Sequence, residues 1–188
     1  MELISNTIVL IAIIGYVFFE IAFLLKKTES LFYKGYFLLF SILHFSISIF
    51  FAYNLDFFES VNDPHIYFQA SVSADNWLSL FQLGHRIAAF VVYPLVNLGI
   101  TLQTLFIVFS AISFKGFLVY FELLDVTKFK SRYHLFLLIF FLIPSVNLWT
   151  GFFGKDALVF LLMALVLKEV NKNRLNYLII TLILFVFI

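Results

Sequence analysis

The chain has 188 residues, of which 63% are apolar and only 12% are charged, and its mean hydropathy is +1.07. A typical soluble domain is about 45–50% apolar and about 25% charged. A chain of this length cannot enclose so much apolar surface away from water. The composition therefore excludes a soluble enzyme, a nucleic-acid-binding module and a disordered chain. It predicts an all-α, polytopic transmembrane helical bundle.

The charge balance and the absence of cysteine narrow the chemistry further. Twelve Lys and Arg residues face eleven Asp and Glu residues, so the net charge of +1 predicts no polyanionic partner such as nucleic acid. The chain has no cysteine, which excludes disulfides, thiolate metal sites and cysteine nucleophiles.

The first two apolar stretches are long enough to cross a membrane, since a hydrocarbon core of about 30 Å requires about 20 apolar residues. They are residues 3–25, which end at Lys26 and Lys27, and residues 35–53. The first has neither a cationic start nor a small-residue cleavage site, so we predict a retained anchor and not a signal peptide. Residues 54–86 follow as the longest polar loop, and loops of this length usually carry function.

The basic residues indicate which parts of the chain face the cytoplasm. Arg86 and Lys155 fall on the same side as the acidic loop. The positive-inside rule then places the N-terminus and residues 54–86 outside the cytoplasm. The other ten cations lie in or beside the loops on the opposite side: Lys26, Lys27, Lys34, Lys115, Lys128, Lys130, Arg132, Lys168, Lys172 and Arg174.

Two later apolar segments do not fit simple spans. Residues 87–121 would extend about 52 Å as one helix, so we predict one crossing preceded by a shorter outer-leaflet piece, with a break near residues 94–99. Residues 135–167 are flanked by cations on both sides, so the chain should go in and come back through a recessed external turn at residues 144–156. With residues 177–188, the prediction is about six membrane segments in one domain, 1–188, truncated at its C-terminus.

Asp63 and Tyr67 are the first candidate site residues, on the external loop. Pro64 disfavours the α conformation at Asp63 and can start a helix, which leaves the carboxylate near a helix N-terminus. A carboxylate held ionised there can accept a proton or bind a cation. The alternative is that Asp63 only caps the helix. His65 and His85 share the loop with the solvated acids Asp56, Glu59 and Asp75, but their spacing matches no metal-ligand motif.

The second candidate group lies in the turn PSVNLWTGFFGKD. Its polar or interfacial members are Asn147, Trp149, Lys155 and Asp156. An ionisable residue at membrane depth indicates function unless it is paired. The alternative is a self-compensating pair in which Asp156 is the N-cap of a helix that begins at Ala157. For Arg86, anchoring to lipid head groups explains its position as well as substrate binding does.

Glu20 and His44 lie within apolar segments. We expect Glu20 to be paired or to reach the membrane surface, and His44 to bond a neighbouring helix. So few charges inside the spans argue against an ion-translocating protein.

Taken in order, the basic turn between two N-terminal helices, the Asp-x-x-x-Tyr pattern, Arg86 and the P-S-x-N-x-W-x-G…G-K-D turn resemble the integral-membrane glycosyltransferases of the GT-C type. The nearest likeness is to the bacterial EpsG-like and Wzy-like proteins that build surface polysaccharide. The likeness covers residues 1–170 by layout and about 25 positions by motif.

The resemblance implies a protein of the bacterial cytoplasmic (inner) membrane. It implies transfer of sugar from a polyprenyl-phosphate-linked donor to a glycan or lipid-linked acceptor on the outer face of that membrane. It implies that Asp63 is the general base or a metal-binding carboxylate and that Arg86 and Lys155 hold the lipid phosphate. The paired acidic motif of many such enzymes is missing, which leaves the use of a divalent metal open. The alternatives are a non-catalytic subunit or a transporter in polysaccharide assembly and export.

Overall fold

The computed structural model describes residues 2–54, 63–81, 87–123, 138–172, 174, 177–179 and 181–183. Within these ranges all regular structure is helical, so the all-α prediction is confirmed there. The helices are α1 (Glu2–Lys27), α2 (Leu31–Tyr53), α3 (Asp63–Ser73), the 3-10 helix η2 (Trp77–Leu80), α4 (Ile87–Asn97), α5 (Leu102–Leu123), α7 (Pro144–Gly151) and α8 (Lys155–Asn171).

Three of these helices, α1, α2 and α5, are long and apolar enough to cross a membrane, and a fourth span results if the bent pair α7 and α8 is counted as one. Helix α1 buries none of its residues and exposes large side chains such as Ile8 and Phe18. Such a surface is unfavourable in water and suits contact with lipid. The apolar helices therefore indicate a membrane protein, while the predicted count of six segments is not confirmed.

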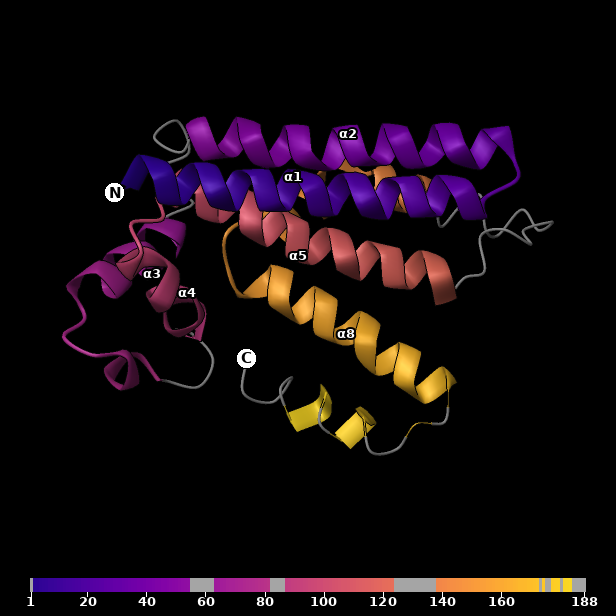
Figure 1. The fold of residues 1–188 in the computed structure, drawn as a ribbon. Helices are drawn as coiled ribbons and strands as arrows, with labels where there is room; N and C mark the ends of the chain where they lie inside the picture. The colour runs from indigo at the N-terminus through magenta and orange to yellow at the C-terminus, as the bar shows by residue number, and fades with distance from the viewer. Residues whose placement is uncertain are drawn as a thin grey trace.

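Helix α5 is the central helix of the bundle, with α1 and α2 on one side of it and α8 on the other (Figure 1). Helix α8 runs in the same direction as α5, because Phe109 contacts Phe153 and Glu122 binds Lys168 further along. A Cβ added at Gly116 would lie 2.8 Å from the Phe160 ring, so the missing side chain permits the close packing of these two helices.

Helices α7 and α8 are joined by a sharp bend. Helix α7 runs parallel to α2, since Asn147 bonds His44 and the Gly151 carbonyl accepts from Ser48 one turn later. The axes of α7 and α8 are bent by 103° at residues 152–154. A bend of this size occurs in a broken span as well as in a re-entrant turn, so the inward and return path stays a prediction.

The predicted break in residues 87–121 lies between α4 and α5. Gly99 adopts φ 81°, a left-handed conformation that suits glycine. The Gly99 amide donates to the Val96 carbonyl and the Ile100 amide to the Leu95 carbonyl, which is a Schellman motif. From α1, Asn6 donates to the Gly99 carbonyl at 2.8 Å and fixes this turn to the first helix.

Pro94 lies inside α4 and does not itself end the helix, contrary to the expectation that it helps to form the break. Proline has no N–H, so the carbonyl of Phe90, four residues earlier, lacks its helical donor. The indole N–H of Trp77 donates to this carbonyl instead, with 2.7 Å between nitrogen and oxygen. The rings of Trp77 and Phe90 also stack, with their centroids 5.0 Å apart. The expected long loop is therefore partly helical: it holds α3 and η2, and η2 is anchored to α4.

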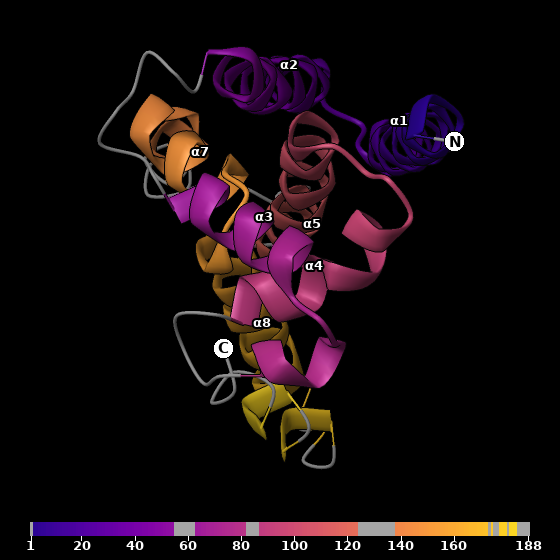
Figure 2. The ribbon, with the colours of Figure 1, turned by 90° about the vertical axis from the view of Figure 1, so that its left-hand side faces the viewer.

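The two ends of the bundle differ in composition. Helices α3, η2 and α4 gather at one end, the α3 end, where Figure 2 shows them in front of the long helices. The cations Lys26, Lys27, Lys168 and Lys172 lie at the last turns of α1 and α8, at the opposite end, here called the lysine end. These four cations, predicted to share one side, lie at one end of the bundle, whereas Arg86, Lys128, Lys130 and Arg132 are outside the described residues.

Candidate functional site

A cavity of about 170 Å³ at the α3 end joins the two candidate groups that the sequence places far apart. One wall is the start of α3 and the other is the α7–α8 turn. Five of the predicted site residues line it: Asp63, Tyr67, Trp149, Lys155 and Asp156. Pro64, Phe152, Phe153 and Gly154 complete the lining.

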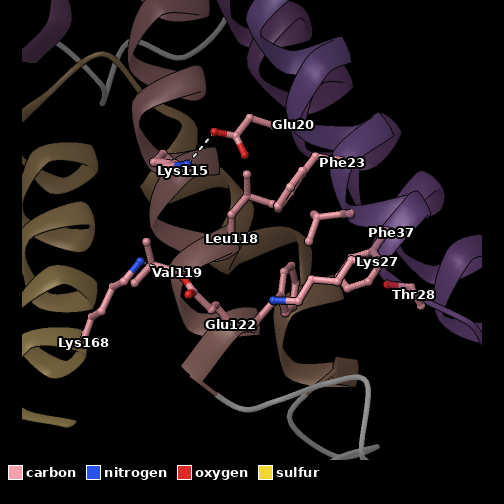
Figure 3. Close-up of a pocket in the computed structure, with 12 residues that line it drawn as sticks. Glu20, Phe23, Lys27, Thr28, Phe37, Lys115, Leu118, Val119, Glu122 and Lys168 are labelled. Atoms are coloured by element: carbon pink, nitrogen blue, oxygen red, sulfur yellow. Dashed lines mark hydrogen bonds and ion pairs between the residues drawn. The ribbon is translucent and has the colours of Figure 1, made fainter. Parts of the chain in front are cut away.

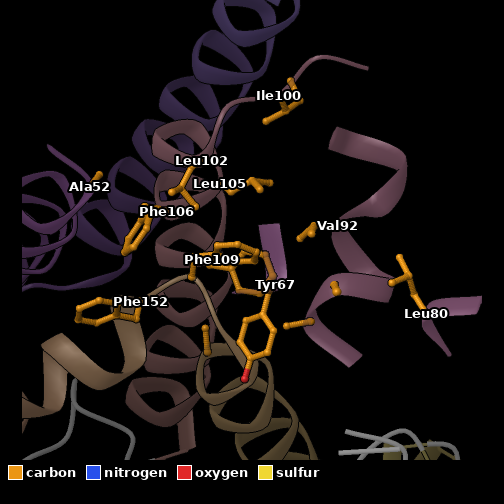
Figure 4. Close-up of a cluster of buried hydrophobic side chains, with 14 residues drawn as sticks. Ala52, Tyr67, Leu80, Val92, Ile100, Leu102, Leu105, Phe106, Phe109 and Phe152 are labelled. Carbon is orange, nitrogen blue, oxygen red and sulfur yellow. The ribbon is translucent and has the colours of Figure 1, made fainter. Parts of the chain in front are cut away.

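Tyr67 positions α3 over the turn. Its side chain is almost fully buried, and its ring contacts that of Phe153 edge to face at 6.2 Å, in the cluster shown in Figure 4. On the other side of α3, the Ser71 hydroxyl donates to the carbonyl of Ala89 in α4 at 3.0 Å. Because α3 is held on both sides, Asp63, its exposed first residue, is placed at the rim of the cavity.

The start of α8 differs from the predicted one. The helix begins at Lys155 and its N-cap is Gly154, so the expectation that Asp156 caps a helix beginning at Ala157 is wrong. A Cβ added to Gly154 would lie 3.9 Å from the Tyr67 ring, which is an ordinary contact distance, so the turn passes close to α3 at this residue. Asp156 instead occupies the first turn, where its charge is favourable next to the positive end of the helix dipole.

Lys155 brings a positive charge to the cavity. It is half-buried, and none of the ion pairs among the described residues involves it. The pairing of Lys155 with its neighbour Asp156 is thus not formed, as expected for adjacent residues on a helix. The amides at the N-terminus of α8 add to the positive potential at the same point.

The carboxylates act on the phenol of Tyr67. Burial, followed by the charges of Asp63 and Asp156, raises the pKa of Tyr67 to about 12. Tyr67 is therefore a neutral hydrogen-bonding group at physiological pH. The cavity combines this phenol with two carboxylates and one ammonium group, and the exposed indole of Trp149 stands at its edge.

Asn147 lies apart from the cavity, in the core of the bundle. Its Nδ2 donates to the Phe141 and Ile143 carbonyls at 2.6 and 3.2 Å, which leaves Oδ1 to accept from His44 Nδ1 at 2.9 Å. The other ring nitrogen of His44 lies 3.0 Å from the Ser110 carbonyl. The expectation that His44 bonds a neighbouring helix is confirmed, and Asn147 serves to hold α7 against α2.

The remaining candidates lie elsewhere. Arg86, His85, Asp56 and Glu59 are outside the described residues. Glu20 is paired, as expected, and its partner is Lys115 of α5.

The described residues contain no group of three side chains suited to hold a metal ion. Asp63 and Asp156 supply two carboxylates to the cavity, and nothing below depends on a metal. Comparison of the chain with protein-family models, with curated proteins and with solved structures finds no match.

Proposed function

We propose that the protein is a membrane glycosyltransferase or repeat-unit polymerase that transfers sugar from a polyprenyl-phosphate-linked donor during bacterial surface polysaccharide synthesis. One observation carries the proposal. The cavity at the α3 end brings an acid, Asp63, and a cation without an ion-pair partner in the described residues, Lys155, to opposite walls of one small space. These are the two groups that transfer from a sugar–phosphate ester requires.

In the proposed reaction, the acceptor hydroxyl attacks the sugar carbon that is bonded to the donor's phosphate. Asp63 accepts the proton of that hydroxyl as the general base. The bond from the sugar to the phosphate oxygen breaks, and the lipid phosphate leaves with the electron pair. Lys155 and the amides at the start of α8 stabilise the negative charge that develops on it. The neutral phenol of Tyr67 borders the same space beside Asp63.

The size of the cavity agrees with a role for the head of the donor and not its chain. Drug-sized ligand pockets usually measure about 300–1,000 Å³, so a cavity of about 170 Å³ suits a phosphate and part of a sugar. A wider cavity of about 740 Å³ lies on the opposite face of α3 and is lined by His65, Gln69, Asn97 and Gln103 among others. Its polar side chains suit the hydroxyl groups of an acceptor.

Replacement of the proposed base tests this function. Asp63→Asn retains the size of the side chain and removes the charge, so turnover should fall by about 10²–10⁴-fold. The measurement is polysaccharide output of a host that depends on the gene, with the amount of protein in the membrane determined in parallel.

Asp75→Asn is the matched control, because Asp75 is an exposed acid of the same region that does not line the cavity. It should leave the output unchanged. Normal output from Asp63→Asn would return Asp63 to the role of an acid at a helix end, and it would favour the non-catalytic subunit or transporter.

A further inference from the structure

Another cavity, of about 190 Å³, lies at the lysine end between α1, α5 and α8, and is here called the lysine-end groove. Figure 3 shows charged side chains from all three helices around it. Glu20 and Lys27 come from α1, Lys115 and Glu122 from α5, and Lys168 from α8. It is separate from the proposed catalytic cavity, which lies at the other end of the same helices.

The charges of the groove do not cancel. Lys115 binds Glu20, and Lys168 binds Glu122 at 2.7 Å. Lys172 lies 3.9 Å from the same Glu122, and the charge of Lys27 also acts on that carboxylate. The three lysines and two glutamates that line the groove leave a net charge of +1, and Lys172, which lies beside Glu122, adds a further positive charge at its edge. Lys27 is exposed and the side chain of Lys172 is 40% exposed, so both can reach an anion without loss of either close ion pair.

The rest of the groove wall is apolar. Phe23 and Leu24 of α1 and Leu118 and Val119 of α5 line it together with the charged groups. Glu20 and Lys27 are seven residues apart, so the charged groups extend about 10 Å along α1. The groove thus presents cations beside a surface that suits an acyl chain, and the exposed apolar surface of α1 indicates lipid beside it.

We propose that the lysine-end groove binds the phosphate of an anionic membrane phospholipid, with the acyl chains against its apolar wall. Lys27 and Lys172 are the cations left over after the two close ion pairs, and they supply the charge that recognises the phosphate. Lys115 and Glu20 form the inner limit of the site. A zwitterionic lipid gains less here, because its head group carries a cation of its own.

Lipid binding to the purified full chain tests this site. The chain is exposed to equal amounts of phosphatidylglycerol and phosphatidylcholine, and bound lipid is measured by native mass spectrometry. We expect the wild-type chain to retain phosphatidylglycerol preferentially. Lys27→Gln should weaken that retention about fivefold, which is the effect of about one basic residue near an anionic surface, and Lys27→Arg should preserve it.

Lys26→Gln is the matched control. Lys26 is the neighbouring cation on the same turn of α1 and does not line the groove, so its loss should have little effect. Equal losses from Lys26→Gln and Lys27→Gln would overturn the proposal in favour of general attraction to an anionic surface. Equal retention of both lipids by the wild type would also overturn it, as would displacement of the lipid by glycerol 3-phosphate, which has the phosphate and no acyl chain.

Discussion

The two ends of the bundle hold cavities of similar size, about 170 Å³ at the α3 end and about 190 Å³ at the lysine end. They differ in how their charges are arranged. At the lysine end, Lys115 and Lys168 each bind a glutamate directly. At the α3 end, Lys155 shares the cavity with Asp63 and Asp156 and has no ion pair among the described residues.

This difference in ion pairing indicates that one end suits the binding of an anion and the other end suits catalysis. A close ion pair has each charge satisfied, so it holds helices together and leaves only surplus charge for a ligand. A lysine without such a partner beside a carboxylate can act on two different atoms of one substrate. We therefore assign binding alone to the lysine end and reaction to the α3 end. The predictions below test this assignment from the largest expected effect to the smallest.

The sidedness of the two ends gives an all-or-none prediction. The chain lacks cysteine, so single cysteines can be introduced at exposed positions: Asp75→Cys at the α3 end and Glu29→Cys at the lysine end. A membrane-impermeant thiol reagent should label position 75 in intact cells and position 29 only after permeabilisation, because basic residues favour the cytoplasmic side. The reverse pattern would place the catalytic cavity inside the cell and contradict the proposed function.

Replacement of Lys155 at the α3 end should lower activity, whereas replacement of Lys26 at the lysine end should not. Lys155→Ala should lower turnover about 10²-fold or more, since it removes the group that we propose to stabilise the leaving phosphate. Lys155→Arg keeps the charge and should retain part of the activity. The same measurement of polysaccharide output applies, and Lys26→Ala at the other end should leave it unchanged. Failure of both Lys155 variants to accumulate in the membrane would show a structural role instead.

The sequence predicts those parts of the fold that depend on residues close together in the chain. Apolar length identifies α1, α2 and α5, and Gly99 indicates the break between α4 and α5. The sequence indicates Asp63 by its Asp-Pro setting on the longest loop, and it indicates Lys155 independently by its charge at membrane depth. Their position in one cavity is not predictable, since it depends on how Tyr67 packs against Phe153.

Other errors and omissions have the same origin in tertiary contacts. Pro94 is tolerated inside α4 because Trp77 supplies the donor for the carbonyl that proline leaves without one. Asn147 has the residue type of a substrate ligand, but the partners of its side chain are His44 and two backbone carbonyls. Small polar residues in apolar helices, such as Ser48, were the available signal for this buried network.

The smallest expected effect concerns the titration of Tyr67. Burial first, and then the carboxylates of Asp63 and Asp156, raise the pKa of Tyr67 to about 12, against about 10 for an ordinary tyrosine. The protonated phenol is therefore favoured in the folded state. Its contribution to stability is fully present below pH about 10 and is lost as the pH rises through about 12. The ultraviolet difference titration between the wild type and Tyr67→Phe should show tyrosinate formation with a midpoint near pH 12.

Replacement of one carboxylate sharpens this test of the cavity. Asp63→Asn removes a negative charge that raises the pKa of Tyr67, so the midpoint for Tyr67 should move down toward the ordinary value. The shift should be partial, because burial is the largest cause and remains. Asp75→Asn changes the net charge equally from outside the cavity and should leave the midpoint in place. Equal midpoints in the wild type and Asp63→Asn would mean that the Asp63 carboxylate does not act on the Tyr67 phenol, and the proposed grouping of the two side chains in one cavity would be wrong.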